Sequence, residues 1–248
     1  MTATDLPPLV AEGLVRRFDG EPAVDEIDLE VRRGEIHAVV GLNGAGKTTL
    51  MRLLLGMLKP DAGRAIVLGF DAAVAPSQVW AEVGHLIETP FAYPELTVEE
   101  NIAAAGLLHG LDRSQIPIMV GQAVEEFGLG RWSGKRARSL SLGNRQRLGI
   151  AAAMVHRPSI LVLDEPANAL DPAGVVFIRD LLKAYAERDA AILVSSHHFD
   201  ELARIADRIT VLHRGCHVGN LDPSGVDLEK RFFDLVYGAD LAIRDGSR

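Results

Sequence analysis

The chain has a single cysteine, Cys216, among its 248 residues. One thiol can form neither an internal disulfide nor a cysteine-based zinc site, and this scarcity fits a reducing cytosol. No stretch reaches the roughly 18 uninterrupted apolar residues that a membrane span needs. The best candidates, 53–58 and 148–155, are far too short. The first ten residues have no basic region and no apolar core, so they predict no secretory signal. We expect a cytoplasmic protein that does not itself cross a membrane.

The chain also lacks an excess of positive charge. Its net charge is −8, and no basic stripe is needed to explain the number of Lys and Arg residues. This composition disfavours a general nucleic-acid binder. Internal repeats, low-complexity tracts and blocks of like charge are absent from the sequence. With 48% hydrophobic and 24% charged residues, the chain has the balance of a globular protein, long enough for one large α/β domain or two small ones.

Apolar runs of strand length alternate with segments of helical spacing. This alternation predicts a mostly parallel sheet with helices on both faces. The first thirty residues instead suggest antiparallel β structure with a turn at "DGEP". Residues 89–157 are rich in Ala, Leu, Gly and Glu, so they predict a helical insertion. The predicted strands of the sheet lie in 36–40, "EVGHLI", "ILVLDEP" (160–166), "AAILVSSHH" (190–198) and a closing "RITVLHRG".

A glycine-rich segment, "GLNGAGKT" at 41–48, follows the first of these strands and precedes a helix. The glycines allow successive backbone N–H groups to turn toward phosphate oxygens, and the helix adds its positive N-terminal end. Lys47 would bring a charge to the β- and γ-phosphates, and Thr48 a hydroxyl to Mg²⁺. Thr49 would reach the α-phosphate. The predicted nucleotide contacts of this segment are Gly41, Leu42, Asn43, Gly44, Ala45, Gly46, Lys47, Thr48 and Thr49.

The second motif is a pair of acidic residues that follows the apolar strand in "ILVLDE". Asp164 lies at the carboxyl end of that strand, where open α/β sheets bind ligands, and would hold Mg²⁺ directly or through water. Glu165 is the candidate base for an attacking water. The simpler alternative is a pair of helix-capping acids after a strand. The two motifs together predict a nucleoside triphosphatase, a class that many families share.

The segment "LSLGNRQRLGIAAAMVHRPSILVLDEP" at 140–166 resembles the signature region of the ABC ATPases. Ser141, Gly143, Gln146 and Arg147 stand at the matching positions, whereas Leu142 and Asn144 depart from the common pattern. Ser141 also suits the N-cap of a helix, whose N-terminus favours anions. A capped helix with no ligand is the alternative interpretation.

Further motifs of the same family occur in order. Phe18 matches the aromatic residue that stacks on adenine, although a core phenylalanine is the alternative. Asp171, in "NALDP", matches a polar contact to a second subunit, and "LVSSHH" places His197 on the γ-phosphate with His198 beside it. Glu88 stands where the family carries a glutamine that meets Mg²⁺ or the attacking water. A carboxylate there is a better Mg²⁺ ligand than an amide.

The resemblance covers roughly residues 8–240 and implies one ABC ATPase domain. Its expected parts are a catalytic core (8–88 and 158–222), a helical signature subdomain (89–157) and a C-terminal helix with a tail (223–248). It implies ATP and Mg²⁺ as cofactors and a head-to-tail dimer. In that dimer each ATP is held by the phosphate loop of one subunit and by Ser141 and Gly143 of the other.

The resemblance is strongest to ATPase subunits that drive a separate transmembrane permease, in the branch of bacitracin and lantibiotic exporters. It rests on "IETPFAYPELTVEENI" and on the expected closing helix "DLEKRFFDLVYG". Within the first segment, Thr97 and Glu100 predict a helix cap, and Phe91 and Tyr93 are candidates for the permease-binding groove. The alternative is a soluble ABC ATPase that acts on ribosomes or DNA, which typically has two such domains or a long coiled-coil insertion. An importer subunit with an added regulatory domain is disfavoured.

Overall fold

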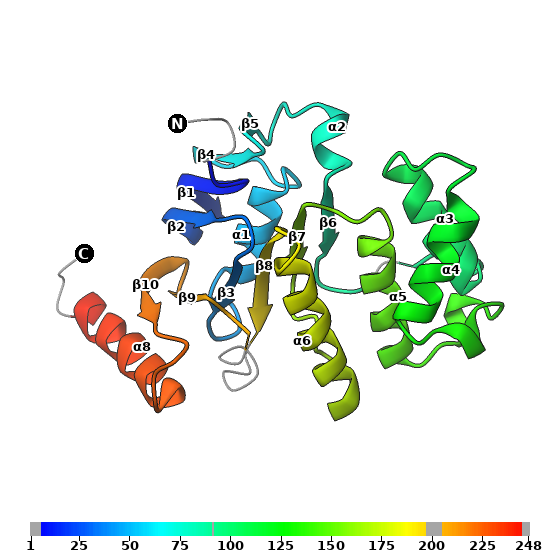
Figure 1. Cartoon of the computed structure of the whole chain (residues 1–248). Helices are drawn as coiled ribbons and strands as arrows, with labels where there is room; N and C mark the ends of the chain where they lie inside the picture. Colours follow the sequence, from blue (N-terminus) through cyan, green and yellow to red (C-terminus); the bar gives the residue numbers. More distant parts are fainter. Residues whose placement is uncertain (1–5, 91, 197–204, 245–248) are drawn as a thin grey trace.

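The computed structural model describes residues 6–90, 92–196 and 205–244. Its central sheet has six strands in the order β10-β9-β3-β8-β7-β6, and all are parallel except β10. Parallel strands with helices packed beside them were predicted from the alternating sequence pattern (Figure 1). The bounds are β3 (Ile36–Val40), β6 (Val83–Leu86), β7 (Ile160–Leu163), β8 (Ala191–Ser196), β9 (Arg208–His213) and β10 (Cys216–Leu221).

A smaller antiparallel sheet has the strand order β2-β1-β4-β5. Its strands are β1 (Leu9–Phe18), β2 (Glu21–Val31), β4 (Ala62–Val67) and β5 (Phe70–Asp71). The predicted antiparallel part is therefore confirmed, but its first turn is tighter than "DGEP". Phe18 pairs with Glu21, so only Asp19 and Gly20 form the turn, both with positive φ. An Asp-Gly pair readily adopts this left-handed backbone.

Helix α1 (Lys47–Leu54) follows the glycine-rich loop and packs in one apolar cluster with residues of both sheets. The segment "KTTLMRLLLGML", which is apolar at helical spacing, predicts a longer helix that extends to Leu58. The structure ends it four residues earlier, before Gly56, whose φ is +64°. A Cβ at this glycine would lie 2.7 Å from the carbonyl oxygen of Ala72, so the close approach of another chain segment fixes the turn.

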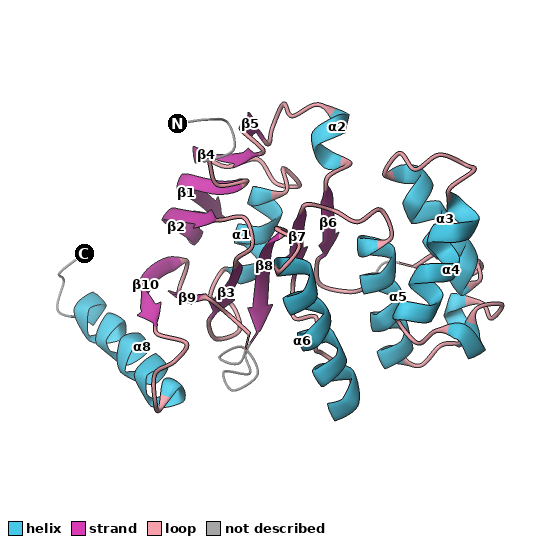
Figure 2. Cartoon of the chain, viewed as in Figure 1, coloured by secondary structure: helices cyan, strands magenta, loops and turns pink. Residues whose placement is uncertain are grey.

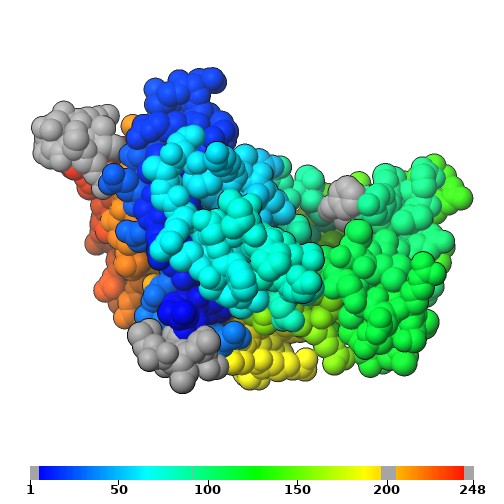
Figure 3. Space-filling view, turned by 90° about the horizontal axis from the view of Figure 1, so that it is seen from above, coloured from blue at the N-terminus to red at the C-terminus, as the bar shows by residue number. Residues whose placement is uncertain are grey.

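The region between β6 and β7 is helical, as predicted, and forms a lobe to one side of the sheets (Figures 2 and 3). It contains α3 (Val98–Leu108), α4 (Ile116–Glu126), α5 (Leu142–Met154) and the short 3₁₀ turns Gly130–Trp132 and Ala137–Ser139. The predicted cap of α3 is confirmed. The Thr97 hydroxyl accepts a hydrogen bond from the Glu100 N–H, and the Glu100 carboxylate accepts one from the Thr97 N–H.

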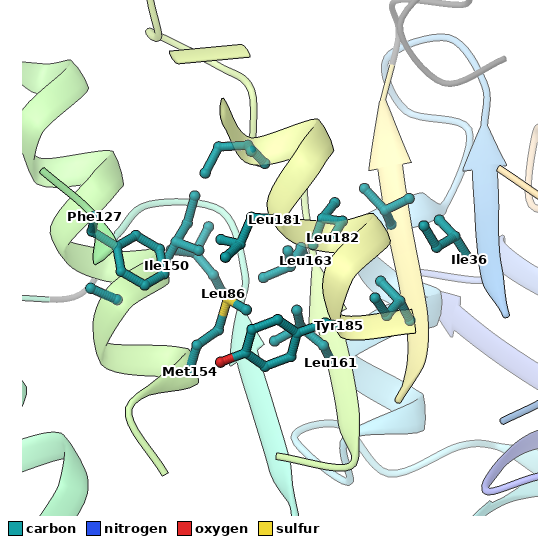
Figure 4. Packing of buried hydrophobic residues seen from close by; sticks show 14 of the residues in the cluster. Ile36, Leu86, Phe127, Ile150, Met154, Leu161, Leu163, Leu181, Leu182 and Tyr185 are labelled. Carbon is teal, nitrogen blue, oxygen red and sulfur yellow. The ribbon is translucent and has the colours of Figure 1, made fainter. Parts of the chain in front are cut away.

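The helical lobe shares a hydrophobic core with the central sheet. Phe127 and Ile150 from the lobe belong to the same buried cluster as Leu86 and Leu161 from the strands. Helix α6 (Pro172–Ala186) adds Tyr185 to this cluster (Figure 4). Because α5 contributes buried side chains to this cluster, the start of α5 has a fixed position relative to the strand ends.

The short helix α2 (Ser77–Trp80) was not predicted from the sequence. Strand β10, which returns antiparallel to β9 after a turn at Arg214 and Gly215, was not predicted either. Helix α8 (Leu228–Arg244), which was predicted, packs against these two strands (Figure 1). Among the described residues, no helix is both long and apolar enough to cross a bilayer.

Candidate functional site

The strand order brings the sequence motifs to one edge of the central sheet. Strand β8 lies between β3 and β7, and all three run in the same direction. The glycine-rich loop leaves the carboxyl end of β3, and Asp164 leaves the carboxyl end of β7. The two motifs therefore flank the end of β8, the crevice in which open α/β sheets bind ligands.

The glycine-rich loop needs glycine for two reasons. Gly46 has a φ of +102°, and a Cβ there would lie 2.2 Å from the carbonyl oxygen of Ala23. A Cβ at Gly41 would lie 2.5 Å from the carbonyl oxygen of Leu212. Gly44 also has a positive φ, but it faces open space. Helix α1 begins without a side-chain cap and without an acid in its first turn, so its positive end suits an anion.

Lys47 lies inside this loop with only 7% of its surface exposed. Its Nζ donates a hydrogen bond to the carbonyl oxygen of Gly41 at 2.7 Å. The same nitrogen lies 3.8 Å from Oε1 of Glu165. The predicted phosphate-binding cation and the predicted base for water therefore border the same space.

A hydrogen-bonded chain connects the three strand ends. The Thr48 hydroxyl donates to Oδ2 of Asp164 at 2.7 Å, and the Ser195 hydroxyl donates to Oδ1 of the same carboxylate at 2.5 Å. Ser195 also accepts a hydrogen bond from the Glu165 N–H at 2.9 Å. The fully buried Ser195 thus fixes both acidic residues, and sequence reasoning missed it. Its signal was the Ser-Ser pair at the end of the apolar strand before His197.

Thr48 and Asp164 fit a magnesium site. Mg²⁺ prefers hard oxygen ligands and usually takes only one or two protein groups, completing its shell with water and substrate phosphates. A hydroxyl and a carboxylate oxygen 2.7 Å apart supply such a pair beside the phosphate loop. Among the described residues there is no cluster of three or more His, Cys, Asp or Glu side chains, which a metal cage would need.

Apart from the crevice at the strand ends, a hollow of about 570 Å³ lies at the start of α5. Ser141 caps α5 as predicted, since its hydroxyl accepts a hydrogen bond from the Asn144 N–H. Gly143 approaches the 169–171 loop so closely that a Cβ would lie 2.7 Å from the carbonyl oxygen of Ala169. Asp171 caps α6 and lies 3.6 Å from the Arg147 guanidinium. No residue of the phosphate loop lines this hollow.

Two predicted nucleotide contacts have distinct settings. Gln146 is only 4% exposed and donates from Nε2 to the carbonyl oxygen of Pro166, so its amide ties α5 to the segment after Glu165. Phe18, in contrast, is 44% exposed, which rules out the alternative of a core phenylalanine. The Arg16 guanidinium lies 4.8 Å from the centre of its ring. The ring therefore offers a face for stacking at the end of β1.

Glu88 lies in an ion pair with Arg52 of α1, with Oε2 2.7 Å from Nη2. Its side chain is half exposed and its φ is +61°, in the left-handed region that few non-glycine residues adopt. The structure thus places Glu88 next to the helix that begins at Lys47, and its role as a metal ligand stays a prediction. His197, the predicted γ-phosphate contact, lies outside the described residues, as do Phe91 and His198.

Beside Glu88, a groove of about 380 Å³ runs between β6, α3 and α5. Tyr93 and Leu108 line it and also line an adjoining apolar hollow. Leu108 is 76% exposed, so a large apolar side chain faces solvent at the edge of the groove. Arg52, the ion-pair partner of Glu88, also lines the groove.

This geometry defines a nucleoside triphosphate site of the P-loop class. Its parts are the buried strand, the glycine loop, Lys47 at the start of the helix and the Thr48–Asp164 pair. The comparisons identify the family within that class. A family model described as "ABC transporter" matches residues 24–168. The chain belongs to this ABC transporter family. A second model, described as an AAA domain and putative AbiEii toxin of a type IV toxin–antitoxin system, matches residues 134–204.

Among known proteins, the bacitracin transport ATP-binding protein BcrA from Enterococcus faecalis is 39% identical over 222 residues, which are 89% of this chain and 70% of that protein. The protein of the same name from Bacillus licheniformis is 34% identical over 203 residues, 82% of this chain and 65% of that protein. A solved structure, an ATP-binding subunit of an ABC transporter, superposes with a TM-score of 0.81 at 28% identity and covers 92% of this chain and 94% of its own.

Proposed function

We propose that this chain is the ATP-binding and ATP-hydrolysing subunit of an ABC transporter that drives a separate transmembrane permease. The observation that carries the proposal is the chain of hydrogen bonds from Thr48 through Asp164 and Ser195 to the Glu165 backbone, beside the buried Lys47. In this crevice, Lys47 supplies a cation for the phosphates. Thr48 and Asp164 supply oxygen ligands for a metal, and Glu165 supplies a carboxylate for water.

Each residue of the site has its own role in ATP binding and hydrolysis. Lys47 and the loop at 41–46 hold the β- and γ-phosphates and offset the charge that develops on them. Thr48 and Asp164 would hold Mg²⁺, which supplies further charge compensation when it is bound. Glu165 accepts a hydrogen bond from the attacking water and aims it at the γ-phosphate. Phe18 stacks on the adenine, and His197 contacts the γ-phosphate.

A head-to-tail dimer is part of this proposal. The hollow with Ser141 and Gly143 lies at the N-terminus of α5, which favours anions, but no phosphate-loop residue lines it. We assign this hollow, with Asp171 at its border, to the γ-phosphate side of an ATP bound to a second ATPase subunit. Within the chain, residues 8–88 and 158–222 form the catalytic core, 89–157 the signature-bearing helical subdomain and 223–248 the C-terminal helix and tail.

The groove lined by Tyr93 and Leu108 is the proposed contact with the permease. Exposed apolar side chains rimmed by polar ones, here Arg52 and Thr89, are typical of protein-binding surfaces. An amphipathic helix of the permease would lay its apolar face in such a groove. The chain would then lie on the cytoplasmic face of the membrane through its partner. The two relatives from E. faecalis and B. licheniformis are named bacitracin transport ATP-binding proteins, which favours a drug or peptide as the transported substrate, and we propose that transport runs outward.

The soluble alternative, an ABC ATPase that acts on ribosomes or DNA, has less support. The net charge of −8 disfavours contact with nucleic acid. The helical lobe consists of short helices that share their core with the sheet, and it holds no long coiled coil among the described residues. Co-purification with a membrane protein would support the transporter, whereas co-purification with ribosomes would support the alternative.

The direct test of ATP use compares the wild type with Lys47→Ala. The wild type should bind and hydrolyse MgATP, whereas Lys47→Ala should bind it at least roughly tenfold more weakly, because a charge-assisted contact to the phosphates is lost. Binding is measured by titration with a fluorescent ATP analogue and hydrolysis by phosphate release. Lys183→Ala, a change at an exposed lysine of α6, is the matched control. Equal affinity of wild type and Lys47→Ala would contradict the proposal.

A further inference from the structure

The phosphate loop rests on the turn between β9 and β10. The Gly215 N–H donates a hydrogen bond to the carbonyl oxygen of Ala45 at 3.0 Å. On the other side, the Gly215 carbonyl accepts a hydrogen bond from the Asp25 N–H at 2.8 Å. A Cβ at Gly41 would touch the carbonyl oxygen of Leu212, and one at Gly46 would lie 3.4 Å from Cα of Gly215. The turn is therefore a wall of the phosphate loop.

The same turn is held by helix α8 through one carboxylate. Oδ1 of Asp240 lies 2.9 Å from Nε2 of His213 and 3.2 Å from Nη2 of Arg214. A carboxylate only accepts hydrogen bonds, so the His213 Nε2 carries the hydrogen in this contact. These two donors are the residues immediately before Gly215. Asp240 thus holds the backbone one residue away from the contact to Ala45.

Helix α8 does not depend on Asp240 for its docking. Leu228, Phe232 and Val236 lie on one face of the helix and are buried in the same cluster as Val211 and Leu221. This apolar stripe fixes α8 against β9 and the edge strand β10 (Figure 1). The contact of Asp240 is additional, and the His213 side chain that it meets is only 9% exposed.

We propose that Asp240 is a positioning residue for the phosphate loop. It fixes His213 and Arg214, these fix Gly215, and Gly215 fixes Ala45 at the centre of the loop. The inference rests on the proposed function, because it assigns to α8 an effect on ATP binding. A loop that presents its backbone to phosphates must be held closely, since a shift of about 1 Å from productive geometry weakens a site substantially.

The test measures two properties of Asp240→Ala. Removal of the carboxylate should speed hydrogen exchange of the Gly215 amide, which loses its fixed geometry toward Ala45. It should also weaken MgATP binding roughly tenfold. Asp240→Asn keeps one acceptor oxygen for His213 and should fall between Asp240→Ala and the wild type. It also carries the comparison if the alanine variant does not fold. Asp234→Ala, on an exposed position of the same helix, is the matched control and should match the wild type in both measurements.

These measurements distinguish a wrong role for Asp240 from a wrong proposal of ATP binding. If the Asp240 variants lower the unfolding temperature but leave Gly215 exchange and MgATP affinity unchanged, Asp240 only clamps the helix and the inference is overturned. If the wild type itself fails to bind MgATP, the proposed function is wrong, while Gly215 exchange still reports whether Asp240 holds the turn.

Discussion

Ser195 connects the parts of the candidate site more directly than any residue the sequence motifs name. Its hydroxyl donates to Asp164 and accepts from the Glu165 N–H, and both contacts are shielded from water because Ser195 is fully buried. A buried hydrogen bond to a charged group contributes more than a neutral one. The relative position of the proposed metal-binding carboxylate and the proposed base for water therefore depends on this hydroxyl.

We predict that Ser195→Ala destabilises the fold by about 1–3 kcal/mol, because it removes the buried hydrogen bond to the Asp164 carboxylate and the acceptor of the Glu165 N–H. The loss of alignment at Asp164 and Glu165 should also lower kcat for ATP roughly tenfold or more. Urea unfolding and phosphate release measure the two effects. Ser159→Ala, at the opposite end of the neighbouring strand β7, is the control. An unchanged kcat in Ser195→Ala would show that the hydroxyl does not position the site.

Glu88 is the carboxylate in the place where the family carries a glutamine. Its pairing with Arg52 is half exposed, and exposed ion pairs contribute only about 0–1 kcal/mol. We therefore expect Glu88→Gln to leave the free energy of unfolding nearly unchanged. If the carboxylate engages the metal once MgATP is bound, the variant should need a higher Mg²⁺ concentration for half-maximal ATPase activity. An identical Mg²⁺ dependence in wild type and Glu88→Gln would make Glu88 a tolerated substitution.

The sequence predicted those residues whose spacing along the chain is itself informative. The glycine loop with Lys47 and Thr48 is local, and so is the acidic pair at the end of β7. The structure brings these two motifs together. Ser195 was missed because its role depends on β8 lying between β3 and β7, and strand order is not visible in a local motif. The Glu88–Arg52 pair was missed for the same reason, since it joins two separate elements.

At the scale of elements, the groove between β6, α3 and α5 is the surface on which the permease is proposed to dock. Leu108 is the last residue of α3 and is the most exposed apolar side chain that lines the groove. Helix α3 has its own capping box at Thr97 and Glu100, so its position does not depend on this exposed end.

We predict that Leu108→Ser weakens co-purification with the permease and leaves the ATPase rate of the isolated subunit unchanged. A buried leucine at an interface contributes about 1.5–3 kcal/mol, so the loss should be measurable in a pull-down from membranes. Val74→Ser, a change at an apolar side chain that is also largely exposed but does not line the groove, is the control. Equal recovery of the permease with wild type and Leu108→Ser would mean that this groove is not the contact.

The periodicity of apolar residues predicted where most helices and strands occur. Where these helices and strands end is set by tertiary contacts. Helix α1 stops before Gly56 because the chain at Ala72 approaches closely, which no local pattern records. Strand β10 was missed because its sequence, "CHVGNL", is only partly apolar and is paired on one side alone. Yet the turn before β10 supports the phosphate loop through Gly215 and Ala45, so the missed strand belongs to the proposed site.

At the scale of the whole molecule, the chain presents a phosphate loop and a separate hollow, which we propose belong to two different ATP sites. The phosphate loop lies at the ends of the central strands, and the hollow with Ser141 lies at the start of α5 without any phosphate-loop residue in its lining. The buried cluster shared by the lobe and the sheet fixes one relative to the other. In the proposed dimer, a second ATPase subunit turned head to tail would bring its phosphate loop to the hollow of the first.

The behaviour of Glu165→Gln with MgATP tests the proposed ATPase mechanism and the proposed dimer most directly. Glutamine keeps the shape of the side chain but removes the carboxylate that accepts from water, so turnover should fall about 10²- to 10⁴-fold while ATP binding persists. Glu187→Gln, at the exposed end of α6, is the control. Light scattering and phosphate release on the same sample should then show an ATP-dependent dimer that does not hydrolyse. Hydrolysis at the wild-type rate, or a monomer that binds ATP without dimerising, would contradict the account.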